Sequence, residues 1–271
     1  MVRDIKIYNQ QDLNEKVMTL FSILNVVGYD EENNEKGMSE QRLFVRKNLK
    51  DIVQMPAITQ IKGYLSKAHP WYLLNALLSG IEDPEINGFL SSFETCFKMP
   101  EIRKVAEHLS QATESKEKDG VENTIRGVVD FIGVNKFNVR EICHLYVPVE
   151  AFWRGYSMNV GGVGYIIYGP GFEKSGYELI VHEVLHLCEK TFSTNSDLLE
   201  SDFVNRSPDD AYGDKDILKG EYVVRALGLI YKEKILKADI TKDVISEELE
   251  FPHIRKMKAE IEFQLKNTKT T

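Results

Sequence analysis

Residues Glu178–Cys188 read ELIVHEVLHLC, and this stretch predicts a buried helix that carries polar chemistry. Apart from two glutamates and two histidines it contains only apolar residues, so most of the helix surface must be buried. Burial of two imidazoles and a carboxylate without a shared partner would be costly. Ser175 and Glu178 form a capping-box pattern, which predicts that a helix over about residues 176–190 begins there.

His182 and His186 lie four positions apart and therefore on one face of that helix, with about 5–6 Å between their Cβ atoms. Two neutral imidazoles in this arrangement can reach one ion at the ~2.0–2.1 Å of a zinc–nitrogen bond. Glu183 is rotated out of the direct ligand set but is close enough to accept a proton from a metal-bound water. This is the HExxH motif of zinc peptidases. The alternative is a histidine pair satisfied by ion pairs or by the core.

A catalytic zinc site needs a third protein ligand and an open position, and the candidates are acidic residues after the motif. Glu221 ranks first because it opens an apolar helix, GEYVVRALGLIY, in which an inward-facing acid needs a reason. The competing interpretation is a glutamate that the helix dipole stabilises at an N-terminus. Arg225, one turn further on, would either orient that carboxylate or pair with it at the surface. Asp209 ranks second, and the remaining candidates are Glu189, Asp197 and Asp202.

Residues 175–230 resemble the zincin superfamily of metallopeptidases. The HEVLH sequence at 182–186, followed by a later glutamate, resembles its gluzincin branch. It is also similar to a poorly characterised family of bacterial zincin-like proteins, in which a Gly-rich strand precedes the motif helix. In that family the motif helix is followed by a helix that begins with Glu and carries an Arg-Ala pair. The corresponding pair here is Arg225-Ala226. Asp209–Gly213 resembles the Asp-x-x-Tyr-Gly stretch of the aspzincins, whose Asp is the third ligand, so Asp209 stays open beside Glu221.

The resemblance implies a zinc metallopeptidase that hydrolyses peptide bonds with one Zn²⁺ ion per chain. His182, His186 and Glu221 would hold the zinc, which lowers the pKa of its water towards ~7 and polarises the substrate carbonyl. Glu183 would act as general base on that water. Tyr212 would donate a hydrogen bond to the oxyanion, unless it is an ordinary packed loop tyrosine.

Zincins hold extended substrate against an edge strand above the motif helix. The stretch Val160–Tyr168, VGGVGYIIY, suits that role, and an ordinary turn and strand fits it equally well. The rival function is a catalytically inactive zincin-like binding or regulatory module, with or without metal.

The order of elements predicts an α+β protein, with a mostly helical first half followed by a zincin-like region with a small sheet. Asp12–Val27 and a segment opened by Ser39 place apolar residues at helical spacing. Further helices are expected near 70–80, 85–97, 101–113 and 121–132.

The pattern changes after Asn135. Ile142–Val149 and Gly164–Tyr168 indicate strands, and a polar loop at 191–214 separates the motif helix from helices at about 216–236 and 252–266. We therefore predict a helical region, 1–135, that packs on or caps the cleft, and a catalytic region, 136–271. The two could also form one continuous domain. The polar run 110–120 is the expected mobile loop or domain boundary.

The composition is that of an ordinary soluble folded protein, with 42% apolar and 28% charged residues. A net charge of −8 disfavours nucleic acids and anionic membranes as partners, so we expect a peptide or protein substrate. The three cysteines lack metal-ligand spacing and predict neither a disulfide framework nor a Cys-based zinc site. The first residues contain no signal-peptide pattern, and no apolar run reaches the ~18 residues of a membrane span. We expect a cytoplasmic protein, unless an export signal has been removed.

Overall fold

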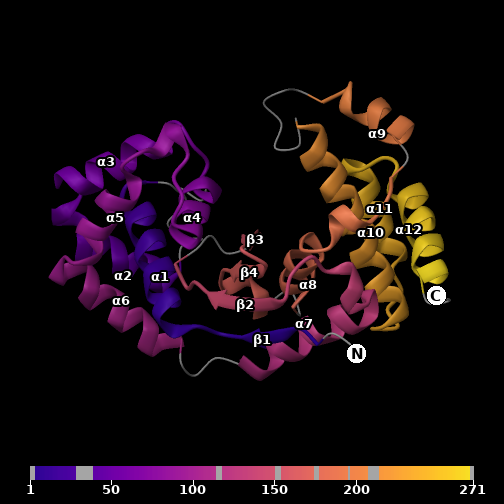
Figure 1. Ribbon diagram of the computed structural model, residues 1–271, viewed down its shortest axis with the longest axis horizontal. Coiled ribbons are helices and arrows are strands. Elements are labelled where there is room, and N and C mark those ends of the chain that lie inside the picture. Colours follow the sequence, from indigo (N-terminus) through magenta and orange to yellow (C-terminus); the bar gives the residue numbers. More distant parts are fainter. Residues whose placement is uncertain are drawn as a thin grey trace.

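The computed structural model describes residues 4–28, 39–113, 118–149, 154–173, 177–194, 196–206 and 214–268. Helices surround a four-stranded mixed sheet, so the α+β class predicted from the sequence is confirmed. Figure 1 shows this sheet between two groups of helices. Within the described ranges, none of the helices combines the length and the apolar character that crossing a bilayer requires.

A small sheet forms the centre of the protein. Its strands are β1 (Lys6–Tyr8), β2 (Glu141–Tyr146), β3 (Gly155–Val160) and β4 (Val163–Tyr168). The strand order is β1-β2-β4-β3, so β1 and β3 form the edges. β2 is parallel to both of its neighbours, whereas β3 pairs with β4 antiparallel.

The hairpin between β3 and β4 corrects the predicted substrate strand. We expected Val160–Tyr168 to form an edge strand, but it spans the end of β3, a turn and the inner strand β4. Gly161 and Gly162 form the turn with φ angles of 61° and 85°, a combination that favours glycine and reverses the chain within two residues. The edge strand that lies beside the motif helix is therefore β3.

The first group of helices covers one face of the sheet. It consists of α1 (Gln11–Val26), α2 (Glu40–Leu49), α3 (Pro56–Leu65), α4 (Pro70–Ser79), α5 (Phe89–Phe97) and α6 (Pro100–Thr113). Cys143, Leu145 and Ile167 of the sheet join the buried core of this group. The Ser39 side chain caps α2, and Gly80 ends α4 in the left-handed conformation (φ 72°).

The second group covers the opposite face and contains the motif helix, α8. It consists of α7 (Lys118–Ile132), α8 (Glu178–His186), α9 (Ser196–Phe203), α10 (Lys215–Lys234), α11 (Thr241–Glu250) and α12 (Ile254–Thr268). Ile142, Ile166 and Tyr168 of the sheet join this second core. Because β2 and β4 contribute side chains to both cores, they are buried on both faces, which explains their nearly continuous apolar sequences.

The predicted division at residue 135 falls inside the second group of helices. α7 precedes it in the sequence, yet the buried residues of α7 share a core with α8 and α10. The polar run 110–120 is helical at both ends, with residues 114–117 outside the described part of the chain. The division into two regions stays a prediction.

One prediction for the second half is wrong, and the motif helix starts two residues later than expected. The polar loop expected at 191–214 contains α9, whose sequence SDLLESDF has too few apolar residues to show a helical pattern. α9 is held by tertiary contacts instead, since Asp202 accepts a hydrogen bond from the Tyr222 hydroxyl at 2.7 Å. The motif helix begins at Glu178, because Tyr177 takes a left-handed conformation (φ 68°) that does not continue a helix. Ser175, the expected cap, lies outside the described residues.

Candidate metal centre

α8 buries one side and carries two histidines on the other. Ile180, Val184 and Leu185 are fully buried in the second core. His182 and His186, one turn apart, keep 30% and 22% of their side-chain surface exposed. Their ring centroids lie 4.8 Å apart, so the two imidazoles face a common space beside α10.

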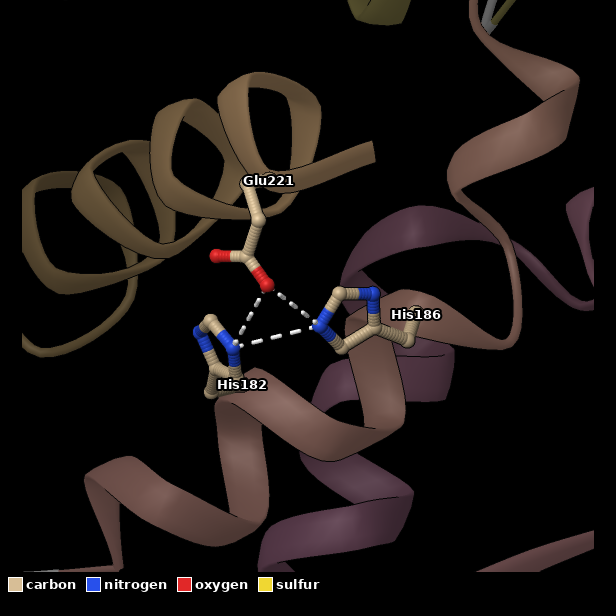
Figure 2. Close-up of side chains that lie close together, drawn as sticks. All are labelled: His182, His186 and Glu221. Atoms are coloured by element: carbon tan, nitrogen blue, oxygen red, sulfur yellow. Dashed lines mark hydrogen bonds and ion pairs between the residues drawn. The ribbon is translucent and has the colours of Figure 1, made fainter. Parts of the chain in front are cut away.

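Glu221 completes a compact group (Figure 2). It does not open its helix as expected, because α10 begins at Lys215 and Glu221 is its seventh residue, beyond the first turn that the helix dipole favours for an acid. Its Oε1 atom lies 3.4 Å from Nε2 of His186 and 3.8 Å from Nε2 of His182. The two Nε2 atoms are 3.2 Å apart. This is the one group in the described part of the chain whose His, Cys, Asp or Glu atoms are placed to share a metal ion.

The three atoms fit the dimensions of a tetrahedral metal site. Bonds of ~2.0–2.1 Å place neighbouring tetrahedral ligands about 3.3–3.4 Å apart, close to the observed separations. Two imidazole nitrogens and one carboxylate oxygen are also the donor set of His₂Glu zinc sites. The group could therefore hold a metal ion with only small movements of the Glu221 side chain.

The other candidate ligands are engaged in different contacts or lie outside the described residues. Asp202 is engaged in a separate buried hydrogen bond on α9, and Glu189 contacts the opposite edge of the His186 ring. The Asp197 side chain and the whole of Asp209 lie outside the described residues. Tyr212, the predicted oxyanion donor, also lies outside them and stays a prediction.

Glu189 fixes the orientation of His186. Its Oε2 atom lies 2.5 Å from Nδ1 of His186, so the ring donates its Nδ1 proton to this carboxylate and directs Nε2 towards Glu221. Gly220 of α10 makes room for that carboxylate, since a Cβ atom at this position would lie 2.9 Å from Oε2 of Glu189. A carboxylate behind a ligating histidine fixes its tautomer and raises its basicity.

The ionisation of the three residues follows from these contacts. Burial, then the neighbouring positive charge of His186, lowers the pKa of His182 to about 3. Burial opposes the charged form of His186, but the hydrogen bonds to Glu189 and Glu221 prevail and raise its pKa to about 10. Burial likewise opposes the ionisation of Glu221, yet the hydrogen bond from His186 and the charges around it lower the pKa of Glu221 to about 2. Without a metal, His186 and Glu221 therefore form an ion pair beside a neutral His182.

Glu183 lies against the edge strand. Its side chain is only 6% exposed, and burial raises its pKa to about 7 even though a hydrogen bond with Ser157 of β3 lowers it. A Cβ atom at Gly155 would lie 2.6 Å from Oε1 of Glu183, so the absence of a side chain there lets the β3 backbone approach the carboxylate. Gly155 and Ser157 were not predicted, because β3 itself was not recognised in the sequence.

The cysteines take no part in this group. Cys96, Cys143 and Cys188 are all buried and unpaired. Burial raises the pKa of the Cys188 thiol to about 12, which keeps it protonated just after α8.

Comparison with known proteins identifies no relative. No protein-family model matches the chain, and no curated protein or solved structure shows significant similarity to it. The function must therefore be argued from the chemistry of the site.

Proposed function

We propose that this protein is a zinc-dependent metallopeptidase with a zincin-like active site. The observation that carries the proposal is the position of Glu221. Its carboxylate comes from a different helix, yet Oε1 lies within 3.8 Å of both histidine nitrogens of the HExxH motif. An isolated motif can arise by chance, whereas a third, inward-facing acid on the open side of both rings is typical of a zinc-binding site.

His182, His186 and Glu221 would hold the zinc ion through Nε2, Nε2 and Oε1. When bound, zinc supplies a Lewis acid that lowers the pKa of water and polarises a carbonyl group. Three protein ligands leave a position open, as catalytic rather than structural zinc sites do.

Glu183 would move the proton. Its carboxylate accepts a proton from the attacking water at one of its oxygens and later passes it to the leaving amine. A pKa of about 7 suits both roles, because the group then exchanges a proton readily near neutral pH. The close approach of the β3 backbone at Gly155 contributes to the burial that raises this pKa.

β3 would hold the substrate. As an edge strand it offers backbone groups on its open side, to which an extended peptide can add as a further strand. Since the β3 backbone lies directly against Glu183, a peptide on this edge would pass close to the general base. The substrate is accordingly an extended peptide or an exposed segment of a protein. Tyr212 remains the predicted oxyanion donor.

The decisive experiment compares zinc content and peptide hydrolysis in Glu183→Gln and a matched control. Purified protein should contain about one zinc per chain and cleave members of a mixed peptide library. Glu183→Gln should retain the zinc and lose turnover by roughly 10²–10⁴-fold. Glu178→Gln is the control, because it makes the same substitution on the same helix. Glu178 pairs with Lys232 and has no part in the proposed reaction.

The outcomes separate the two functions considered. Zinc binding with hydrolysis that depends on Glu183 supports the peptidase. Zinc binding without hydrolysis of any library peptide favours the inactive binding or regulatory module. Equal turnover in Glu183→Gln and the control would show that the general base is assigned wrongly.

A further inference from the structure

Arg225 connects the third candidate ligand to α11, a helix that carries none of the three candidate ligands. Its Nε atom donates to Oε2 of Glu221 at 3.2 Å, the oxygen that does not face the histidines. Its Nη1 atom donates to Oε2 of Glu247 at 2.8 Å. The guanidinium group thus joins a carboxylate of α10 to a carboxylate of α11.

The aromatic ring of Phe251 also contacts the guanidinium group of Arg225. This ring, directly after α11, is completely buried and lies 4.5 Å below the guanidinium carbon of Arg225. Tyr222, the neighbour of Glu221 in the sequence, packs edge-on against the same ring with a centroid distance of 5.1 Å. An arginine stacked on a fixed aromatic ring and bonded at two separate nitrogens has little freedom to rotate.

Arg225 pairs with two carboxylates, those of Glu221 and Glu247, and the second one balances its charge. Arg225 alone would orient Glu221, but its positive charge would also oppose a divalent cation held by the other oxygen of that carboxylate. Glu247 offsets this charge while leaving the hydrogen bond to Glu221 intact. Arg225 with Glu247 therefore orients the ligand at a smaller electrostatic cost to the cation than Arg225 alone.

We propose that Glu247 is a positioning residue of the metal site and acts through Arg225. Glu247 and Phe251, at the end of α11, set the direction of the Glu221 carboxylate through Arg225. The packing of α11 on α10 is therefore thermodynamically coupled to metal affinity. By reciprocity, metal binding stabilises the packing of α11 on α10. This inference rests on the proposed zinc site and extends it to a helix that was not predicted from the sequence.

The test measures the zinc affinity of the full-length chain by competition with a chromophoric chelator. Glu247→Gln should weaken zinc binding about 10-fold or more, as is typical for partners of metal ligands. Glu248→Gln is the matched control, because Glu248 is the next residue of α11 and pairs with Arg255, away from the site. The control should bind zinc as the unchanged protein does. Glu247→Ala, a second variant, should lose at least as much affinity as Glu247→Gln.

A double-mutant cycle tests whether Glu247 acts through Arg225. If Glu247 acts through Arg225, Arg225→Ala combined with Glu247→Ala should bind zinc no more weakly than Arg225→Ala alone. The visible absorption spectrum of the protein saturated with cobalt(II) is a second measurement, which a general loss of protein stability would not change. Glu247→Gln should shift the visible absorption bands of the cobalt-loaded protein, and Glu248→Gln should leave them unchanged.

Each result has one meaning. If the unchanged protein binds zinc and Glu247→Gln binds it equally tightly with the same cobalt spectrum, the positioning role is wrong and the zinc site stands. If the losses in the double variant simply add, Glu247 does not act through Arg225. If the unchanged protein binds no zinc, both the proposed function and this inference are overturned.

Discussion

Nδ1 of His186 lies 2.5 Å from Oε2 of Glu189, on the opposite edge of the ring from Glu221. The same imidazole therefore contacts a carboxylate on each side, one behind it and one across the candidate metal position. Glu189 was one of several acids that the sequence offered as a third ligand. Its position indicates that it orients His186, a candidate ligand, instead.

Gly220→Ala should disturb this contact without changing any ionisable residue. The added Cβ would lie 2.9 Å from Oε2 of Glu189, so the carboxylate must move away from its place behind His186. We expect zinc affinity to fall about 10-fold, the effect typical of losing an outer partner of a ligating histidine. The measurement is chelator competition at constant pH.

Gly228→Ala is the matched control, since a Cβ at this second glycine of α10 would meet nothing within 4 Å. It should leave zinc affinity unchanged and raise the stability of the helix by up to about 1 kcal/mol. Equal zinc affinity in the two variants would contradict the role given to Glu189.

Zinc binding should release about one proton near neutral pH. The metal-free protein holds a proton on His186, whose pKa is raised to about 10, whereas His182 is already neutral because its pKa is lowered to about 3. A ligating Nε2 must be deprotonated, so the apparent affinity should rise about tenfold per pH unit between about pH 6 and 8. Calorimetry in buffers of different ionisation enthalpy counts the protons. Zinc binding without proton release would refute the assigned ion pair.

Glu183→Gln should change the pH dependence of stability in the metal-free protein. The folded state raises the pKa of Glu183 from its ordinary 4.5 to about 7, so it binds more protons than the unfolded state between these values. The stability contributed by this group is therefore present below about pH 4.5 and is lost as the pH rises through about 7. The unfolding free energy of the unchanged protein should fall by at most about 3 kcal/mol over that window relative to Glu183→Gln. Urea unfolding at several pH values tests this, and parallel curves for the two proteins would argue against a buried carboxylate.

Only one of the variants Glu221→Ala and Asp209→Ala should lose zinc binding. Loss of a direct ligand should weaken affinity by more than about 100-fold, beyond the range typical of outer partners. We expect this loss for Glu221→Ala and almost no change for Asp209→Ala. The reverse result would favour the aspzincin-like ligand set.

The sequence was sufficient to predict the parts of the site that depend on local spacing. Two histidines at i and i+4 on an apolar helix lie together wherever that helix is formed. Glu221 was recognisable because the segment that follows it, Tyr222–Tyr231, is apolar apart from Arg225. The α+β class followed in the same way from the change of pattern after Asn135.

The remaining parts depend on contacts between residues distant in sequence. α9 and α11 have few apolar residues and are held by tertiary contacts, such as the one between Asp202 and Tyr222. β3 was not recognised because the Gly161-Gly162 turn was assigned to the expected substrate strand, Val160–Tyr168, although Tyr156, Met158 and Val160 alternate with smaller residues before it. Neither Glu247 nor Gly155 has a local signal, since each matters only through the residue that the fold places next to it.

The central claim is that His182, His186 and Glu221 share one zinc ion, and a crystal grown with zinc tests it most directly. An anomalous difference map recorded at the zinc edge should show one strong peak within about 2.0–2.2 Å of Nε2, Nε2 and Oε1 of these residues. A map without a peak at this position, or a peak whose third protein ligand is Asp209, would contradict the account.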